Sequence, residues 1–129
     1  MSEKETYEKN LFLIGALWNW SAAMLFFGLS VVNKQLLMYF HNIPQTMLWY
    51  YCFLGAVFVF GMGYYWISKD VRRNRDIIKM GIMGKIIVFL LFLIYLLKGE
   101  ITFLLFLAGC VDLIFTVLFI RVLMHIPNY

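Results

Sequence analysis

Four long apolar stretches, separated by short polar breaks, dominate the sequence. A transmembrane helix needs about 20 mostly apolar residues, and the stretches reach that length over about residues 11–32, 46–67, 77–97 and 101–124. Hydrophobic residues make up 64% of the chain and charged residues 14%, whereas soluble domains have about 45–50% and about 25%. We therefore expect an all-α, polytopic membrane protein with four transmembrane helices.

The connections between the stretches constrain their arrangement. Only Lys98, Gly99 and Glu100 separate the third stretch from the fourth, so these two helices are expected to form a tight antiparallel hairpin. The chain has 2 Pro and no Ser- or Gln-rich tract, which leaves little room for a disordered tail or a soluble domain. Residues 1–129 are expected to form a single domain, an antiparallel up-down bundle. Residues 33–45, which include a proline, are expected to lie at the membrane interface.

The distribution of basic residues predicts the orientation. With four spans, both termini and the loop between the second and third stretches share one side of the membrane. That side carries eight of the 11 Lys and Arg residues, the other side carries two, and Lys85 falls inside the third stretch. Cytoplasmic loops are enriched in Lys and Arg. Both termini are therefore expected to be cytoplasmic.

The loop between the second and third stretches is strongly basic, with Lys69, Arg72, Arg73 and Arg75. Two aspartates interrupt it, and neither an aromatic stacking platform nor a nucleic-acid-binding fold accompanies it. Basic residues near a membrane surface attract lipid phosphates with about 1 kcal/mol each. We interpret the loop as a basic membrane surface and expect the lipid bilayer, not nucleic acid, as its partner.

Two ionisable residues, Lys85 and Asp112, fall well inside the predicted helices. Near the centre of a membrane helix, each unpaired charge costs about 2.5–3.5 kcal/mol. Counted from Gly99 in the turn, Lys85 lies 14 residues before it and Asp112 lies 13 after it. At about 1.5 Å per residue, their depths differ by only about 1.5 Å. The hairpin therefore predicts that Lys85 and Asp112 pair.

The same count of depth adds a polar residue from the first helix. Asn19 lies eight residues into the first stretch, as Lys85 does in the third. We expect a polar cluster of Asn19, Lys85 and Asp112, with Ser21 or Thr116 as alternatives for a further member. Small residues near both charges are expected to let the two backbones approach closely: Gly81, Gly84, Ala108 and Gly109.

The cluster has two interpretations. Ionisable residues inside a membrane usually mark a substrate, quinone or proton site. A buried ion pair can instead be structural and fix the register of two helices. The spans contain no second acidic residue that could relay protons, and neither histidine matches the depth of the cluster. These two observations weigh toward the structural role, and both interpretations stay open.

Motifs for catalysis or metal binding are lacking. The sequence has neither Cys-x-x-Cys nor His-Glu-x-x-His spacing. It also has no nucleophile elbow, glycine-rich phosphate loop or pair of neighbouring carboxylates. We therefore expect no catalytic residue and no metal site, and the sequence names no cofactor.

The second half of the chain resembles small bacterial four-helix membrane proteins of the DoxX-like type. The matching elements are Gly63-Tyr64, Asp70, Arg73-Asn74-Arg75, Gly81, Gly84-Lys85, Tyr95, Gly99-Glu100, Asp112, Phe115 and Phe119. The resemblance implies a four-helix bundle of the bacterial inner membrane in which the Gly-Lys and Asp positions belong to the shared design. The DoxX-like name also implies quinone or thiol redox chemistry, but no redox residue of that family has a counterpart here.

Three functions fit these observations. The first is a non-enzymatic accessory or small-ligand-binding membrane protein that holds an amphipathic molecule or a partner helix at the level of Lys85 and Asp112. The second is an oligomeric small-molecule or proton-coupled transporter, which needs a second copy because four helices enclose little room for a water-filled path. The third is a quinone- or thiol-linked redox protein, which needs a bound cofactor. A homo-oligomer or a membrane-protein partner stays open.

Overall fold

The computed structural model describes residues 2–127. Within that range the chain is helical and contains no strand. Each long helix has the length and apolar character to cross a membrane, which confirms the predicted all-α class and the four membrane-length helices. The long helices are α1 (Glu3–Val32), α2 (Leu48–Lys69), α3 (Arg75–Leu97) and α4 (Phe103–His125).

The first helix begins at Glu3 rather than near residue 11, because its first turn is well capped. Ser2 Oγ accepts a hydrogen bond from the Glu5 backbone N–H at 3.2 Å, as an N-cap side chain does. The carboxylates of Glu3 and Glu5 lie in the first turn, where the helix dipole favours negative charge. This extension also carries Glu8, which is buried and was not predicted to be so.

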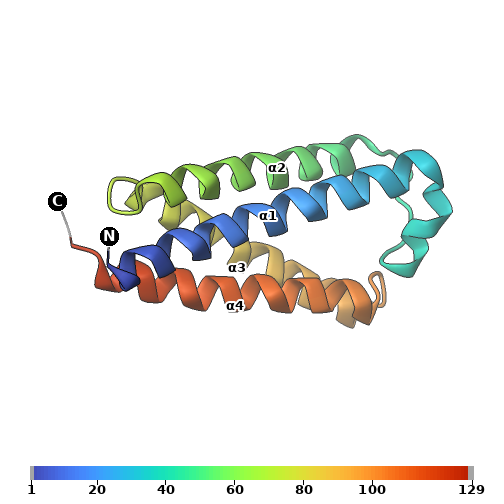
Figure 1. Ribbon diagram of the computed structural model, residues 1–129. Coiled ribbons are helices and arrows are strands. Elements are labelled where there is room, and N and C mark those ends of the chain that lie inside the picture. Colours follow the sequence, from blue (N-terminus) through green and yellow to red (C-terminus); the bar gives the residue numbers. More distant parts are fainter. Residues whose placement is uncertain (1, 128–129) are drawn as a thin grey trace.

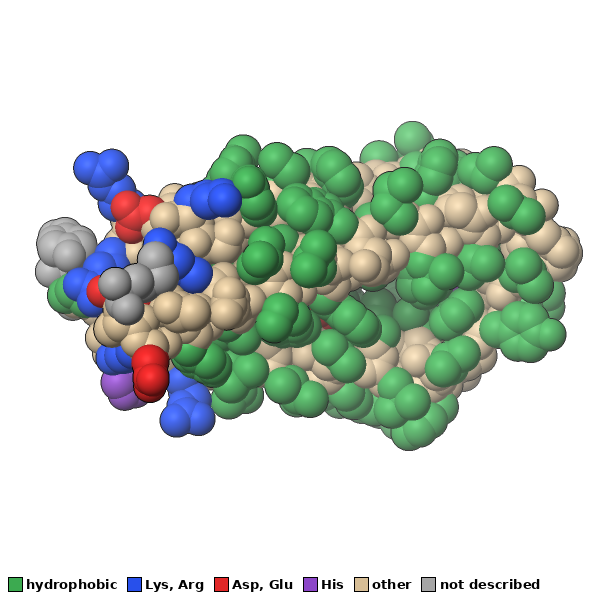
Figure 2. All heavy atoms as spheres, in the orientation of Figure 1, with side chains coloured by type: hydrophobic (Ala, Val, Ile, Leu, Met, Phe, Trp, Pro, Cys, Tyr) green, Lys and Arg blue, Asp and Glu red, His purple; other side chains and the backbone are tan. Residues whose placement is uncertain are grey.

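The long helices lie side by side. The N-terminal end of α1 and the C-terminal end of α4 lie at the same end of the molecule (Figure 1). α1 packs mainly against α2, and α3 packs mainly against α4. Large apolar side chains are exposed along all four helices, and Figure 2 shows charged side chains gathered at the end with the termini. This distribution is that of a chain whose long sides face lipid.

The turn between α3 and α4 has the geometry that lets a helix stop and reverse sharply. Gly99 has a φ of 77°, a left-handed conformation that glycine adopts without steric cost. The Gly99 N–H donates to the Leu96 carbonyl at 3.0 Å, and the Glu100 N–H donates to the Tyr95 carbonyl at 2.9 Å. These two bonds form a Schellman motif. The turn thereby fixes the register on which the depth of Lys85 depends.

The apolar core occupies the half of the molecule that contains the chain ends. At its centre, Phe12 stacks on Phe119 with a centroid distance of 4.5 Å, and the Tyr64 ring lies 5.3 Å from Phe119. Ile67 of α2 and Ile78 of α3 are fully buried beside them. Side chains from all four helices therefore close this half of the molecule.

The connection between α1 and α2 covers the opposite end. It contains the 3₁₀ helix η1 (Lys34–Tyr39), whose Leu37 is fully buried. The Thr102 N–H donates to the Phe40 carbonyl at 2.8 Å, and the Asn42 N–H donates to the Glu100 carbonyl at 3.2 Å. These bonds tie the connection to the turn between α3 and α4.

Candidate functional site

Lys85 of α3 and Asp112 of α4 face each other between the helices. Lys85 Nζ donates to Asp112 Oδ1 at 2.6 Å. The side chains are 5% and 17% exposed, respectively, so both charges are largely withdrawn from the surface. The structure thus brings together the two residues whose depths match in the sequence.

Asn19 joins this pair from α1. Its side-chain carbonyl accepts a hydrogen bond from Lys85 Nζ at 3.2 Å. Its amide N–H donates to the backbone carbonyl of Val57 in α2 at 3.1 Å. Asn19 therefore links α1 with α2 and α3, and the three predicted cluster residues lie together.

Trp18 is a fourth member that sequence reasoning missed. The indole N–H of Trp18 donates to Asp112 Oδ1 at 3.1 Å. The available signal was the position of Trp18 directly before Asn19, because a buried indole N–H usually finds a hydrogen-bond partner. The rotation of α1 about its axis decides whether that N–H reaches Asp112, and the sequence does not supply this rotation.

The two alternatives for a further cluster member have different outcomes. Ser21 is exposed because it lies two residues after Asn19, which places it about 200° further around the helix. Thr116 is buried, but its hydroxyl donates to the backbone carbonyl of Asp112 at 2.9 Å. Thr116 therefore adjoins the ion pair without bonding to either charged group.

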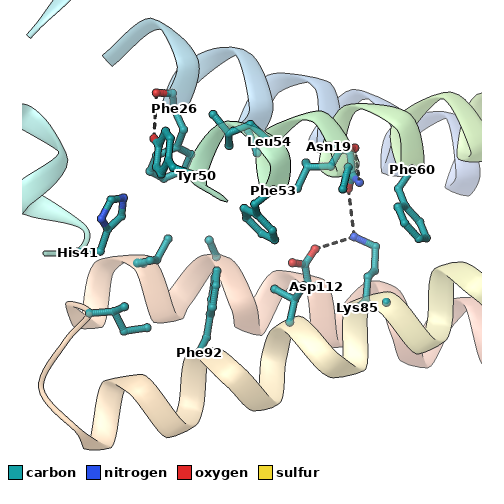
Figure 3. Close-up of a pocket in the computed structure, with 18 of the residues that line it drawn as sticks. Asn19, Phe26, His41, Tyr50, Phe53, Leu54, Phe60, Lys85, Phe92 and Asp112 are labelled. Carbon is teal, nitrogen blue, oxygen red and sulfur yellow. Dashed lines mark hydrogen bonds and ion pairs between the residues drawn. The ribbon is translucent and has the colours of Figure 1, made fainter. Parts of the chain in front are cut away.

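A cavity of about 500 Å³ lies next to the cluster and is lined by residues of all four long helices. Figure 3 shows Lys85 and Asp112 toward one end of it and His41 and Tyr50 toward the other, with Phe53 between them. The wall is mostly apolar and aromatic. The cavity therefore has mostly apolar walls and carries two largely buried charges at one end.

Small side chains leave this space open. Ala22 of α1, Ala56 of α2, Gly84 of α3 and Ala108 of α4 all line the cavity. Gly84 and Ala108 were expected to bring two helix backbones together, and the structure instead places them in the wall. At Gly109 the close contact is with the side chain of Phe92 in α3, whose ring a Cβ atom would approach to 2.9 Å.

The cavity is only partly enclosed. Figure 2 shows a hollow about halfway along the molecule, on the face where Figure 1 places α1 and α4. Apolar side chains surround this hollow. Both helices carry exposed apolar residues, such as Leu17 and Val117. The opening therefore lies on a long side of the molecule rather than at its charged end.

The residues of the basic loop make different kinds of contact. Lys69, Arg72 and Arg73 lie at the surface, and Arg72 also lies 3.7 Å from Glu5. Arg75 also contacts the end of α4. Its Nη1 donates to the carbonyls at the end of α4, which have no partner within the helix: Leu123 at 3.3 Å, Ile126 at 2.9 Å and Pro127 at 3.4 Å.

Residues 2–127 contain no group of three or more His, Cys, Asp or Glu side chains placed to hold a metal ion. Comparison with known proteins gave no matching family model, no matching curated protein and no matching solved structure. The functional argument therefore depends on the geometry of the cavity and its polar cluster.

Proposed function

We propose that this chain is a non-enzymatic integral protein of the bacterial inner membrane that binds a small amphipathic molecule. One observation carries the proposal: a cavity of about 500 Å³ that has the buried Lys85–Asp112 pair at one end. Small-molecule sites typically measure about 300–1,000 Å³ and combine apolar walls with a few placed polar groups. The cavity has both properties within one chain.

In this proposal the helices form an antiparallel up-down bundle with both termini in the cytoplasm. The clustering of charged side chains at the end with the termini (Figure 2) supports this orientation, because cytoplasmic segments are rich in Lys and Arg. The cavity then lies in the outer half of the membrane, and the core around Phe12, Tyr64 and Phe119 separates it from the cytoplasm.

The enclosure of the cluster by a single chain favours binding over transport. A transporter of this size needs a second copy to complete a path, whereas the helices of one chain already surround Asn19, Lys85 and Asp112. The packed core around Phe12, Tyr64 and Phe119 lies between the cavity and the chain ends. The structural role of the ion pair is compatible with ligand binding, because the pair also forms part of the wall.

The proposal is tested by native mass spectrometry of the protein released from lipid nanodiscs, together with chromatography of the extracted small molecules. The wild type is compared with Ala108→Phe, which fills the cavity, and with Val117→Phe, a matched change at an exposed position of the same helix. We expect a bound molecule on the wild type and on Val117→Phe and its loss from Ala108→Phe. A quinone among the extracted molecules would support the DoxX-like redox hypothesis instead.

Two outcomes would contradict ligand binding in the cavity. Retention of the same molecules by Ala108→Phe would show that they bind outside the cavity. A wild type that carries nothing would leave a structural ion pair in an accessory protein. Circular dichroism and size-exclusion chromatography establish that both variants fold before their ligands are compared.

A further inference from the structure

The two oxygens of the Asp112 carboxylate are used differently. Oδ1 accepts both the Trp18 and the Lys85 hydrogen bonds. Among residues 2–127, no hydrogen bond reaches Oδ2. Figure 3 shows this second oxygen directed away from Lys85, on the side of Phe53 and the open cavity. A ligand in the cavity would therefore meet a free carboxylate oxygen.

The donors near Asp112 are already engaged. The Trp18 indole donates to Asp112, and Lys85 donates to Asp112 and Asn19. The Asn19 amide donates to the Val57 carbonyl. The remaining side of Lys85 Nζ faces the rings of Tyr64 and Phe115, at 5.2 and 5.3 Å from their centroids.

The Tyr64 hydroxyl lies close to Gly81, where a Cβ atom would approach it to 3.1 Å. This contact places it on the side of the chain ends. Beside the ion pair, the acceptor Oδ2 is thus an unused polar atom on the open side, and it favours a hydrogen-bond donor on the ligand.

The charges already present in the site determine which kind of donor group on a ligand would fit. Lys85 and Asp112 neutralise each other at 2.6 Å, so an ionic group added beside them would have no counter-charge in surroundings of low polarity, where an unpaired ion is strongly unfavourable. An anionic group would also face the Asp112 carboxylate directly. A hydroxyl group is neutral and carries a proton to donate, whereas a quinone, ketone or ether only accepts.

The walls and the opening indicate the rest of the molecule. Aromatic rings such as Phe53, Phe60 and Phe92 line the cavity, and aromatic walls favour a flat apolar body. The hollow lies on a long, apolar side of the molecule (Figure 2). A ligand that reaches it from this side comes from the bilayer.

We infer that the cavity binds a neutral hydroxyl compound with a flat apolar body, which donates its hydrogen bond to Asp112 Oδ2. The inference rests on the proposed function and narrows it to one class of ligand. It also separates this class from quinones and from carboxylate anions, which cannot donate a hydrogen bond to Oδ2.

The test uses three probes that share one body: 4-phenylphenol, 4-methoxybiphenyl and biphenyl-4-carboxylate. Each probe is equilibrated by dialysis with nanodiscs that contain the wild type, and binding to empty nanodiscs is subtracted to remove partition into lipid. We expect the phenol to bind about tenfold or more tightly than the ether or the carboxylate, the difference that one hydrogen bond to a charged acceptor supplies.

Two variants locate the effect. Ala108→Phe should lose the binding of the phenol, because it fills the cavity. Lys85→Met combined with Asp112→Leu removes both charges without leaving either unpaired, and it should bind the phenol and the ether equally. This double variant keeps the test informative where a single change at Asp112 unfolds the protein.

The outcomes separate the inference from the proposed function. Equal binding of phenol and ether to the wild type, lost in both cases in Ala108→Phe, would overturn the hydroxyl assignment and leave the binding cavity intact. Carboxylate binding as tight as phenol binding would overturn the assignment of a neutral ligand. If no probe exceeds empty nanodiscs, the flat hydroxyl ligand is excluded, and the co-purification experiment alone decides the proposed function.

Discussion

The ring of Tyr64 lies against the bare backbone of Gly81, so closely that a Cβ atom at Gly81 would be 2.6 Å from Tyr64 Cε1. This contact joins α2 to α3 at the boundary between the packed core and the cavity. It also sets the Tyr64 ring 5.2 Å from Lys85 Nζ. The absence of a side chain at Gly81 therefore positions both the core and the wall of the site.

We expect Gly81→Ala to destabilise the protein by about 1–3 kcal/mol, the usual effect of forcing extra atoms into a well-packed interior. The matched control is Gly55→Ala, because nothing lies within 4 Å of a Cβ atom at Gly55 and alanine is the better helix former by about 1 kcal/mol. Unfolding in mixed micelles, followed by circular dichroism, measures both variants. Equal stability of the two variants would show that the contact with Tyr64 is loose.

Removing one partner of the Lys85–Asp112 ion pair should destabilise the protein more than removing both partners. Asp112→Asn leaves the buried Lys85 ammonium without its counter-charge, a loss of about 3–5 kcal/mol when one partner of a buried pair is removed. Lys85→Met combined with Asp112→Leu leaves no charge behind and should lie closer to the wild type. The same unfolding measurement tests this prediction. A double variant that is less stable than Asp112→Asn would show that Lys85 and Asp112 do not neutralise each other.

An exposed pair supplies the control for this comparison. Lys79 and Asp76 lie 3.2 Å apart on one face of α3, with side chains 53% and 92% exposed. Solvent-exposed pairs contribute only about 0–1 kcal/mol. Asp76→Asn should therefore change the free energy of unfolding far less than Asp112→Asn does.

Trp18→Phe tests the hydrogen bond that sequence reasoning missed. The change removes the indole N–H that donates to Asp112, and hydrogen bonds to charged groups contribute about 1.5–3 kcal/mol. We expect a loss of stability in that range, and a much smaller loss once Lys85→Met and Asp112→Leu have removed the acceptor. Trp66→Phe is the control, because Trp66 is half-exposed on α2. Equal effects in the two backgrounds would mean that Trp18 acts by packing alone.

The ion pair could be predicted because depth in a membrane helix is a count of residues at a fixed rise. A short turn at Gly99 provided the origin of that count, and the Schellman bonds show why the turn is sharp. Asn19 followed from the same count, measured from the start of its apolar stretch. What the sequence supplied was therefore position along the helix axes.

The cavity could not be predicted, because it depends on rotation about those axes and on where the helix pairs separate. Small residues serve equally well for close packing and for an open wall. Gly109 packs against the Phe92 ring and Gly84 lines the cavity, and their residue type is the same. Trp18 and the contacts of Arg75 with α4 were missed for a related reason, since long side chains reach partners on another helix that no count of residues identifies.

Arg75 is expected to hold the end of α4, whereas its neighbour Arg73 is not. Arg75→Ala removes the donor to the carbonyls of Leu123 and Ile126, while Arg73 has a largely exposed side chain in the same loop. Both changes to alanine remove one positive charge from that loop, so any effect on membrane orientation is matched. Hydrogen–deuterium exchange over residues 119–127 should quicken in Arg75→Ala and stay unchanged in Arg73→Ala, because loss of these bonds lets the last turn of α4 fray. Equal exchange in the two variants would show that the end of α4 is stable without Arg75. The membrane-surface role predicted for the basic loop would then be sufficient to account for Arg75.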